Sequence, residues 1–341
     1  MKRIFLILIF SLSIAHLFSQ TGGQHVFQFL NLTNSARISA LGGNTIAVND
    51  NDANMALNNP SLLKKEMDGF LGLNYMNYFA GINYGYTSFT KHYDSVGTFN
   101  AAILYANYGN FEYADEFGFR DGSTFTANDM ALVIGYGKTY DSLWTIGANL
   151  KLIGSFYETY SSYGAAVDLA ATYHNPEKRF TAAFVLKNVG YQFKDYTRNN
   201  GQKLPIDAQA GISYRLAHAP LRFSAVASNL QRWDLTYYDE EADPQIDPLT
   251  GEEIIEKRPS VIEKTFRHLT FGTEVLLTEN FHIRLGYNYR RRQELKLADK
   301  LGTTGISWGF GFNIKKFNFG FSRSTYHLVG GSNHFTAAFK I

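Results

Sequence analysis

Side chains along most of this chain alternate between apolar and polar or small from one residue to the next, and this period of two restricts the fold more than any other feature. In residues 144–152, for example, Trp144, Ile146 and Leu150 alternate with Thr145 and Asn149. Successive side chains of a β-strand point to opposite faces, whereas a helix repeats every 3.6 residues. The sequence therefore predicts strands that each have one apolar face.

Fourteen segments of the chain show this alternation. They are residues 70–78, 82–90, 97–107, 127–140, 144–154, 163–173, 180–188, 207–216, 221–230, 268–277, 281–290, 306–314, 317–325 and 334–341. A strand of about ten residues, tilted by about 40°, is long enough to cross an outer-membrane bilayer. The even number and these lengths predict an all-β fold, a transmembrane antiparallel β-barrel of fourteen strands in the bacterial outer membrane.

The connections between these segments support a barrel, because short and long ones alternate. The even-numbered connections contain six residues or fewer, and the odd-numbered ones contain eight or more from the third onwards. Outer-membrane barrels have short periplasmic turns and long surface loops. The first connection, residues 79–81, departs from this rule, since it is predicted to face outward and is short.

The composition favours a barrel over a soluble β-sandwich, the alternative fold for strands with one apolar face. The 341 residues include 28 Phe and 22 Tyr. A sandwich would have to bury these rings in a very large core, whereas a barrel turns them toward lipid. The absence of cysteine excludes a disulfide scaffold and a thiol catalyst, and 32 Lys and Arg against 30 Asp and Glu do not favour a nucleic acid as partner.

The chain divides into three parts. Residues 1–19 have the anatomy of a secretory signal peptide, since Lys2 and Arg3 precede a mostly apolar stretch and Ser19 is a small residue at the expected cleavage site. Residues 20–66 have no apolar period of their own, and residues 67–341 contain the predicted strands. We expect residues 20–66 to form a plug, because the lumen of the barrel is the natural shelter for a polar segment.

Five residues of the predicted plug are singled out for this role. They are Arg37, Asp50, Asp52, Asn59 and Pro60. We expect Arg37 to pair with an inward carboxylate such as Asp168 or Glu274. Other charged residues at inward positions either form a polar permeation path or brace the plug, and we favour bracing. This second set contains Lys151, Lys187, Arg215, Arg222 and Arg284.

No motif in the sequence predicts an enzyme, a metal site or a cofactor. Asp50 and Asp52 begin a run that resembles the start of an EF-hand calcium loop, but Met55 stands where the loop requires Gly and Ser61 where it requires Glu. A hydrogen-bonded turn is therefore the favoured interpretation of this run. The nine His residues have no metal-ligand spacing.

The longest predicted connection, residues 231–267, is the most distinctive surface. It combines aromatic and acidic side chains, and it is either a solvated loop or a docking site for a partner. The residues that we assign to partner binding are Trp233, Tyr237, Tyr238, Asp239, Glu240, Glu241, Asp243 and Asp247. Arg290, Arg291 and Arg292 are predicted at the outer end of the eleventh strand, where they contact lipopolysaccharide phosphates or act as plain interfacial anchors.

Several short motifs resemble those of a known family. They are the run from Ala36 to Gly43 (ARISALGG), the run from Asn58 to Leu62 (NNPSL), Lys187-Asn188-Val189-Gly190 and the run from Ser228 to Trp233 (SNLQRW). Together they resemble the FadL-like outer-membrane barrels, and among these the group of type IX secretion system proteins that includes PorV and PorQ. The resemblance covers nearly all of the chain after the leader. It implies a fourteen-stranded barrel whose N-terminal segment enters the lumen.

The resemblance also implies a function and partners. It implies a non-enzymatic outer-membrane component of the attachment complex, which works with PorU and PorV and holds a PorZ-like protein at the cell surface while cargo is attached to lipopolysaccharide. Two alternatives stay open. One is a FadL-like transporter of hydrophobic compounds, which needs an apolar pocket that continues into a gap in the wall. The other is a lipid hydrolase, which needs a lipid-facing His and Ser pair.

Overall fold

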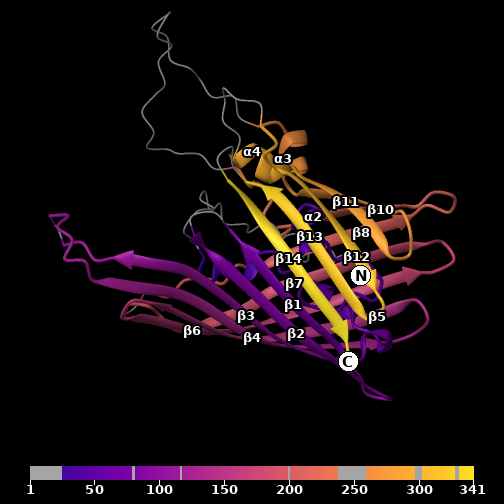
Figure 1. The fold of residues 1–341 in the computed structure, drawn as a ribbon, viewed down its shortest axis with the longest axis horizontal. Helices are drawn as coiled ribbons and strands as arrows, with labels where there is room; N and C mark the ends of the chain where they lie inside the picture. The colour runs from indigo at the N-terminus through magenta and orange to yellow at the C-terminus, as the bar shows by residue number, and fades with distance from the viewer. Residues whose placement is uncertain are drawn as a thin grey trace, which may run out of the picture.

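The structure is a computed structural model of the chain and describes residues 25–78, 81–115, 117–198, 200–236, 259–295, 302–326 and 330–341. Its strands form a closed antiparallel barrel, in which each strand pairs with its neighbours in the sequence and the last strand pairs with the first (Figure 1). The predicted signal peptide, residues 1–19, lies outside the described residues.

Fourteen strands make up this wall. They are β1 (Phe70–Asn77), β2 (Asn83–Tyr93), β3 (Gly97–Glu112), β4 (Thr124–Thr139), β5 (Trp144–Tyr157), β6 (Tyr160–Asn175), β7 (Phe180–Lys194), β8 (Asp207–Arg215), β9 (Leu221–Ala227), β10 (Leu269–Leu276), β11 (Phe281–Asn288), β12 (Ile306–Ile314), β13 (Phe317–Thr325) and β14 (Gly331–Lys340). Each strand overlaps one of the fourteen predicted segments. The predicted all-β fold and strand number are therefore confirmed.

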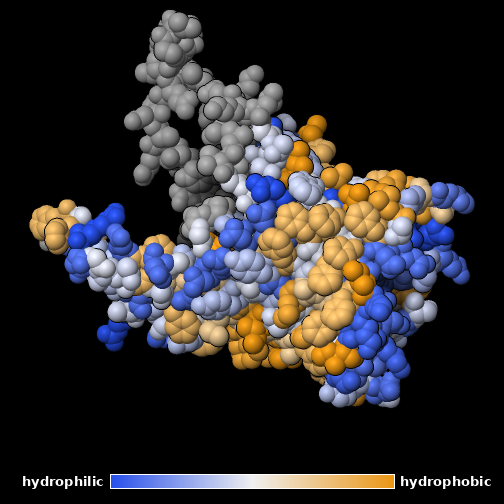
Figure 2. All heavy atoms as spheres, viewed as in Figure 1, coloured by the Kyte–Doolittle hydropathy of each residue, from blue (hydrophilic) through white to orange (hydrophobic). Residues whose placement is uncertain are grey.

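The two faces of the wall differ as the alternation predicts. In β12, Trp308 and Phe310 project outward, whereas Ser307 and Gly309 are buried on the inner face. The same division runs around the barrel, and apolar atoms cover the outer face over β12, β13, β14 and β1 (Figure 2). An apolar outer surface is suited to contact with lipid. The closed barrel can lie in lipid because no strand edge is left with unpaired backbone groups. The protein therefore lies in the outer membrane.

Helices play a small part in this architecture. Within the described ranges, no helix combines the length and apolar character that a membrane span requires. Two short helices, α3 (Val261–Arg267) and α4 (Tyr289–Leu295), lie at the outer ends of β10 and β11. Arg290, Arg291 and Arg292 thus belong to α4, which directly follows β11 at its outer end, and the eleventh strand ends two residues earlier than predicted. The Asn288 side chain accepts a hydrogen bond from the Arg291 backbone nitrogen at 2.9 Å, which begins the helix there.

Strands β3 to β7 extend further outward than predicted, and Figure 1 shows them projecting beyond the rest of the wall. The prediction of a surface loop at residues 155–162 is wrong, because β5 and β6 continue to pair as far as Tyr157 and Tyr160. Glu158 makes the tight turn between them with a φ of 56°. In β7, Asn188 forms a bulge with a φ of 57°. The bulge interrupts the alternation of side chains, so the sequence pattern does not predict the part of β7 that follows Asn188.

Residues 25–67, which we call the lumen segment, precede the barrel in the sequence and lie inside it. The segment contains α2 (Ala36–Ala40) and the 3-10 helices η1 (Gln28–Asn31), η2 (Ala53–Leu57), η3 (Pro60–Leu62) and η4 (Lys65–Met67). Helix α2 packs against β11 to β14, and η3 packs against β4 to β6 on the opposite side of the wall. A segment that contacts both sides of a closed wall fills the space between them.

Candidate functional site in the barrel lumen

Glycines on the inner face bring the lumen segment into direct contact with the barrel backbone. A Cβ atom on Gly286 of β11 would overlap the backbone nitrogen of Gly42, and one on Gly147 of β5 would overlap the carbonyl carbon of Pro60. Neither glycine has a left-handed backbone, so their role is close approach rather than turn formation. At both contact sites the wall thus lacks the side chain that would overlap the lumen segment.

A network of ion pairs joins the segment to the wall in the periplasmic half of the lumen. Arg37 of α2 contacts Asp50 at 2.5 Å and Glu274 of β10 at 2.9 Å. Glu274 also pairs with Arg222 of β9 at 2.8 Å and with Arg284 of β11 at 2.9 Å. Glu274 is buried, so three guanidinium groups converge on one carboxylate that is shielded from water. The structure therefore places Arg37 against one of its two expected partners.

Asp50 is the second acceptor of this network. Burial raises the pKa of Asp50, but the guanidinium groups of Arg37 and Arg222 outweigh this effect and hold the pKa well below its usual range. Asp52 accepts a hydrogen bond from the backbone nitrogen of Asn54 at 3.1 Å, which closes a turn. Among the residues that the structure describes, no cluster of three or more His, Cys, Asp or Glu residues has a metal-binding arrangement.

A second buried network lies on the opposite wall. Lys151 of β5 pairs with Asp168 of β6 at 2.8 Å, and both side chains are buried. Asp168 is therefore not the partner of Arg37. Nearby, the Asn59 side chain donates to Thr172 at 2.9 Å and accepts from the backbone nitrogen of Ser61, which places Asn59 and Pro60 against β6.

The outer half of the lumen contains a large apolar cluster that the alternation did not predict. The lumen segment contributes Val26, Phe27, Phe29, Leu30 and Leu57, and the wall contributes Met76, Tyr84, Tyr86, Ala102, Leu104, Ala106, Ala131, Val133, Ile153 and Ala166. A signal for it exists in the sequence, since residues 101–106 and 130–134 are unbroken apolar runs. Such runs are typical of strands that are covered on both faces.

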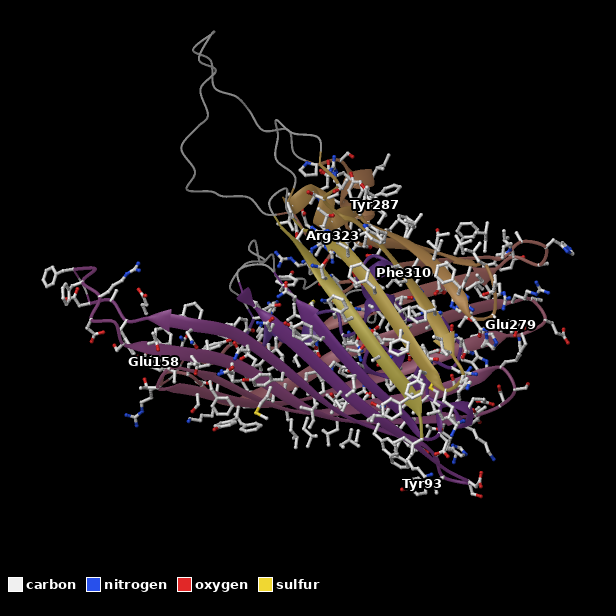
Figure 3. All side chains as sticks on the ribbon, viewed as in Figure 1. Tyr93, Glu158, Glu279, Tyr287, Phe310 and Arg323 are labelled. Carbon is white, nitrogen blue, oxygen red and sulfur yellow. The ribbon has the colours of Figure 1, made fainter. Side chains whose placement is uncertain are left out.

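An outer groove and an inner cavity lie on opposite sides of the wall at β13. The groove opens toward lipid, has a volume of about 460 Å³ and is bordered by Phe310, Phe335 and other aromatic residues of β12 to β14 and β1. The cavity has a volume of about 580 Å³ and contains the Arg37 network. Phe319, Gly320 and Thr336 border both spaces. Phe310 is labelled on this face in Figure 3.

The residues assigned to surface contacts have separate positions. Trp233 is 60% exposed, and its carbonyl oxygen lies 3.1 Å from the His268 ring nitrogen. The rest of the proposed partner-binding set, Tyr237 to Asp247, lies outside the described residues. Arg290 pairs with Glu294 at 2.9 Å, Arg292 donates to the Gly302 carbonyl, and Arg291 lies over the Tyr326 ring at 4.0 Å from its centroid. Contact of these arginines with lipopolysaccharide stays a prediction.

Comparisons with known proteins bear on the fold. None of the protein-family models and none of the curated proteins matches the sequence. The Ralstonia pickettii toluene transporter TbuX superposes with a TM-score of 0.53 at 12% identity, over 92% of this chain and 98% of that one. The Pseudomonas putida toluene transporter TodX gives 0.51 at 13% identity, over 90% and 96%. A Pseudomonas aeruginosa FadL homologue gives 0.50 at 11% identity, over 90% and 98%.

The chain has the fold of the FadL-like outer-membrane barrels. Identities this low show a shared architecture and no more. The FadL-like part of the resemblance noted in the sequence is therefore supported, whereas the closer likeness to PorQ rests on the short motifs alone.

Proposed function

We propose that this barrel transports small hydrophobic compounds across the outer membrane. The observation that carries the proposal is that the outer groove and the lumen cavity both border Gly320, from opposite sides of the wall. This residue has no side chain on the inner face, and a Cβ atom there would lie 3.4 Å from the Cβ atom of Ala36. The backbone of β13, which is paired with β12 and β14 at this point, and the small Ala36 and Thr336 side chains therefore separate the lipid-facing groove from the lumen.

The two apolar regions suit opposite ends of a transport path. The apolar cluster in the outer lumen offers a dry environment to a compound that enters from the cell surface, and the aromatic groove offers one to a compound that leaves toward lipid. Passage between them requires α2 to shift, because Ala36 lies behind Gly320, and requires β13 to separate locally from a neighbouring strand, because the wall is closed there. TbuX and TodX, which share the fold, are toluene transporters, and this supports the choice of a small aromatic compound as cargo.

Filling the groove is expected to slow transport. Ala337 of β14 lies in the groove on the outer face, so Ala337→Leu adds bulk there without touching the lumen segment. We expect a several-fold lower initial rate of radiolabelled toluene uptake in cells that depend on this barrel. The matched control is Ala101→Leu, because Ala101 is an exposed residue of β3 that is not part of the groove.

Two results would overturn the proposal. One is equal uptake by the wild type and by Ala337→Leu. The other is uptake by wild-type cells that does not exceed that of cells without the protein.

A second candidate function is the one that the resemblance to PorQ implies, in which the outer surface holds a PorZ-like protein together with PorU and PorV. The observation in its favour is the hairpin of β3 and β4, whose tip presents Phe117 and Phe119 with 88% and 70% of their surfaces exposed. Exposed aromatic side chains beyond the lipid layer have no role in packing the barrel. They are suited to anchoring a protein partner.

The double substitution Phe117→Ser with Phe119→Ser tests this candidate. We expect it to reduce recovery of a PorZ-like partner in a pull-down from detergent-solubilised outer membrane, because burial of each ring contributes to the interface. Tyr140→Ser is the control, since Tyr140 is 79% exposed at a periplasmic turn. Unchanged recovery with the double variant, or no partner with the wild type, would contradict this function.

A further inference from the structure

A polar pocket lies at the outer end of the lumen, apart from both the groove and the Arg37 network. It has a volume of about 330 Å³, which is at the small end of the range for ligand sites. The lumen segment contributes Asn31 and Asn58, and the wall contributes Lys187 of β7 and Gln209 of β8. Arg291 of α4 completes the set. We call this space the outer polar pocket.

The pocket has cations without ion-pair partners. The ammonium group of Lys187 donates to the Asn58 side chain at 3.0 Å, and Lys187 is only 5% exposed. In the part of the chain that the structure describes, no carboxylate lies within ion-pair distance of Lys187 or Arg291. Asp207 borders the pocket and accepts from the Asn229 backbone nitrogen and from the Gln209 side chain, both at 2.6 Å, so its negative charge acts on Lys187 only from beyond ion-pair distance. Buried charges are usually paired, so Lys187 favours an anion, and Arg291, which is half-buried over the Tyr326 ring, adds a second positive charge to the pocket.

Three buried polar atoms of residues that line the pocket also lack hydrogen-bond partners among the described residues, and one of them is the Nδ1 atom of His25. The other two are a donor, the Nη1 atom of Arg291, and an acceptor, the Oε1 atom of Gln209. Gln209 is 3% exposed, and its amide nitrogen is fixed by Asp207, so the amide oxygen faces away from that carboxylate. Buried polar groups in folded proteins nearly always have a partner. A ligand that accepts from Arg291 and donates to Gln209 would complete both.

We propose that the outer polar pocket binds a soluble sugar acid that enters from the cell surface. Its carboxylate pairs with Arg291 and Lys187, because a guanidinium fork matches a carboxylate. One of its hydroxyl groups donates to Gln209, and the side-chain amides of Asn31 and Asn58 serve the others as donors or acceptors. A simple carboxylate lacks the hydroxyl donor, and a neutral sugar lacks the anion. The site extends beyond the proposed transport of hydrophobic compounds and does not depend on it.

The ligand test uses the full-length protein in detergent and isothermal titration calorimetry. D-glucuronate is the probe, and D-glucose and acetate are its neutral and hydroxyl-free controls. We expect D-glucuronate to bind at least about tenfold more tightly than either control, since each control loses a hydrogen bond to a charged or buried group. Absence of glucuronate binding, or equal affinity for glucose, would overturn the proposal.

The variant test examines recognition of the carboxylate and recognition of the hydroxyl group separately. Arg291→Gln is expected to weaken glucuronate binding by about tenfold or more, because a charge-assisted pair is lost. Arg323→Gln is the matched control, since Arg323 is an exposed residue at the outer end of β13. Gln209→Met is expected to weaken glucuronate binding and leave acetate binding unchanged. Heat-modifiable gel migration verifies that each variant is folded, and wild-type affinity in folded Arg291→Gln would refute the site.

Discussion

The substitution Glu274→Gln is expected to lower the free energy of unfolding by about 3–5 kcal/mol, the usual result of removing one partner from a buried ion pair. Glutamine keeps the shape of the side chain and removes its charge. Three guanidinium groups, those of Arg37, Arg222 and Arg284, then lose the carboxylate on which they converge. The remaining acceptors, Asp50 and Asp52, belong to the lumen segment, so the ion pair of Asp50 with Arg222 of β9 at 3.0 Å is the tie to the wall that this network keeps.

Urea unfolding of the protein refolded in lipid vesicles, followed by tryptophan fluorescence, measures this change. The control is Glu279→Gln, which removes the same charge from an exposed periplasmic turn next to β10 and is expected to change the unfolding free energy by less than about 0.5 kcal/mol. If both variants unfold at the same urea concentration as the wild type, the network does not hold the segment in place.

The substitution Gly286→Val is expected to displace α2 from the wall. The new side chain would occupy the position of the Gly42 backbone, which has no flexible side chain that could move aside. Overpacking of this kind costs about 1–3 kcal/mol when the surroundings can adjust, and displacement of the segment is the adjustment that the lumen offers. Proteolysis of the lumen segment by a protease added to the purified barrel measures the displacement, because the segment is buried in the wild type.

Gly85→Val is the matched control for this experiment. Gly85 lies on β2, and a Cβ atom there meets nothing closer than 4.0 Å. Both substitutions add a β-branched residue to a strand, so any difference between them comes from the contact with the segment. Equal protection of the segment in the two variants would show that the contact at Gly286 is not tight.

The barrel was predictable from the sequence because membrane and lumen impose opposite demands on alternate residues. In β12, for example, aromatic residues alternate with Ser307, Gly309 and Gly311, and the pattern needs no knowledge of which strand lies beside it. The outer extensions of β3 to β7 were not predictable in the same way. Beyond the lipid, both faces of a strand meet water or protein, so the alternation that marks a strand is lost.

The sequence predicts which types of side chain pair across the lumen, but it does not predict which residues pair. An arginine in a polar segment inside a barrel needs a carboxylate, but Asp168 and Glu274 satisfy this condition equally in the sequence. The choice depends on which strands face α2, and this follows from the closure of the wall rather than from any local pattern. The outer polar pocket was missed for a related reason, since Lys187, Gln209 and Arg291 come from distant parts of the chain and share no motif.

The position of the lumen segment also determines the order in which the barrel can assemble. The segment continues directly into β1, and β1 pairs with β14, the last strand to be synthesised. The hydrogen bond from the Ala36 backbone nitrogen to the Thr336 side chain and the ion pair of Arg37 with Glu274 join residues that are 300 and 237 positions apart. Contacts between residues so distant in sequence form late in folding.

Pairing of β1 with β14 closes the wall around the lumen segment, so the segment must already be inside at that step. The segment is then a template on which the last four strands, β11 to β14, settle before the seam joins. A change that detaches the template therefore slows the joining of the seam, even where the finished barrel tolerates the change.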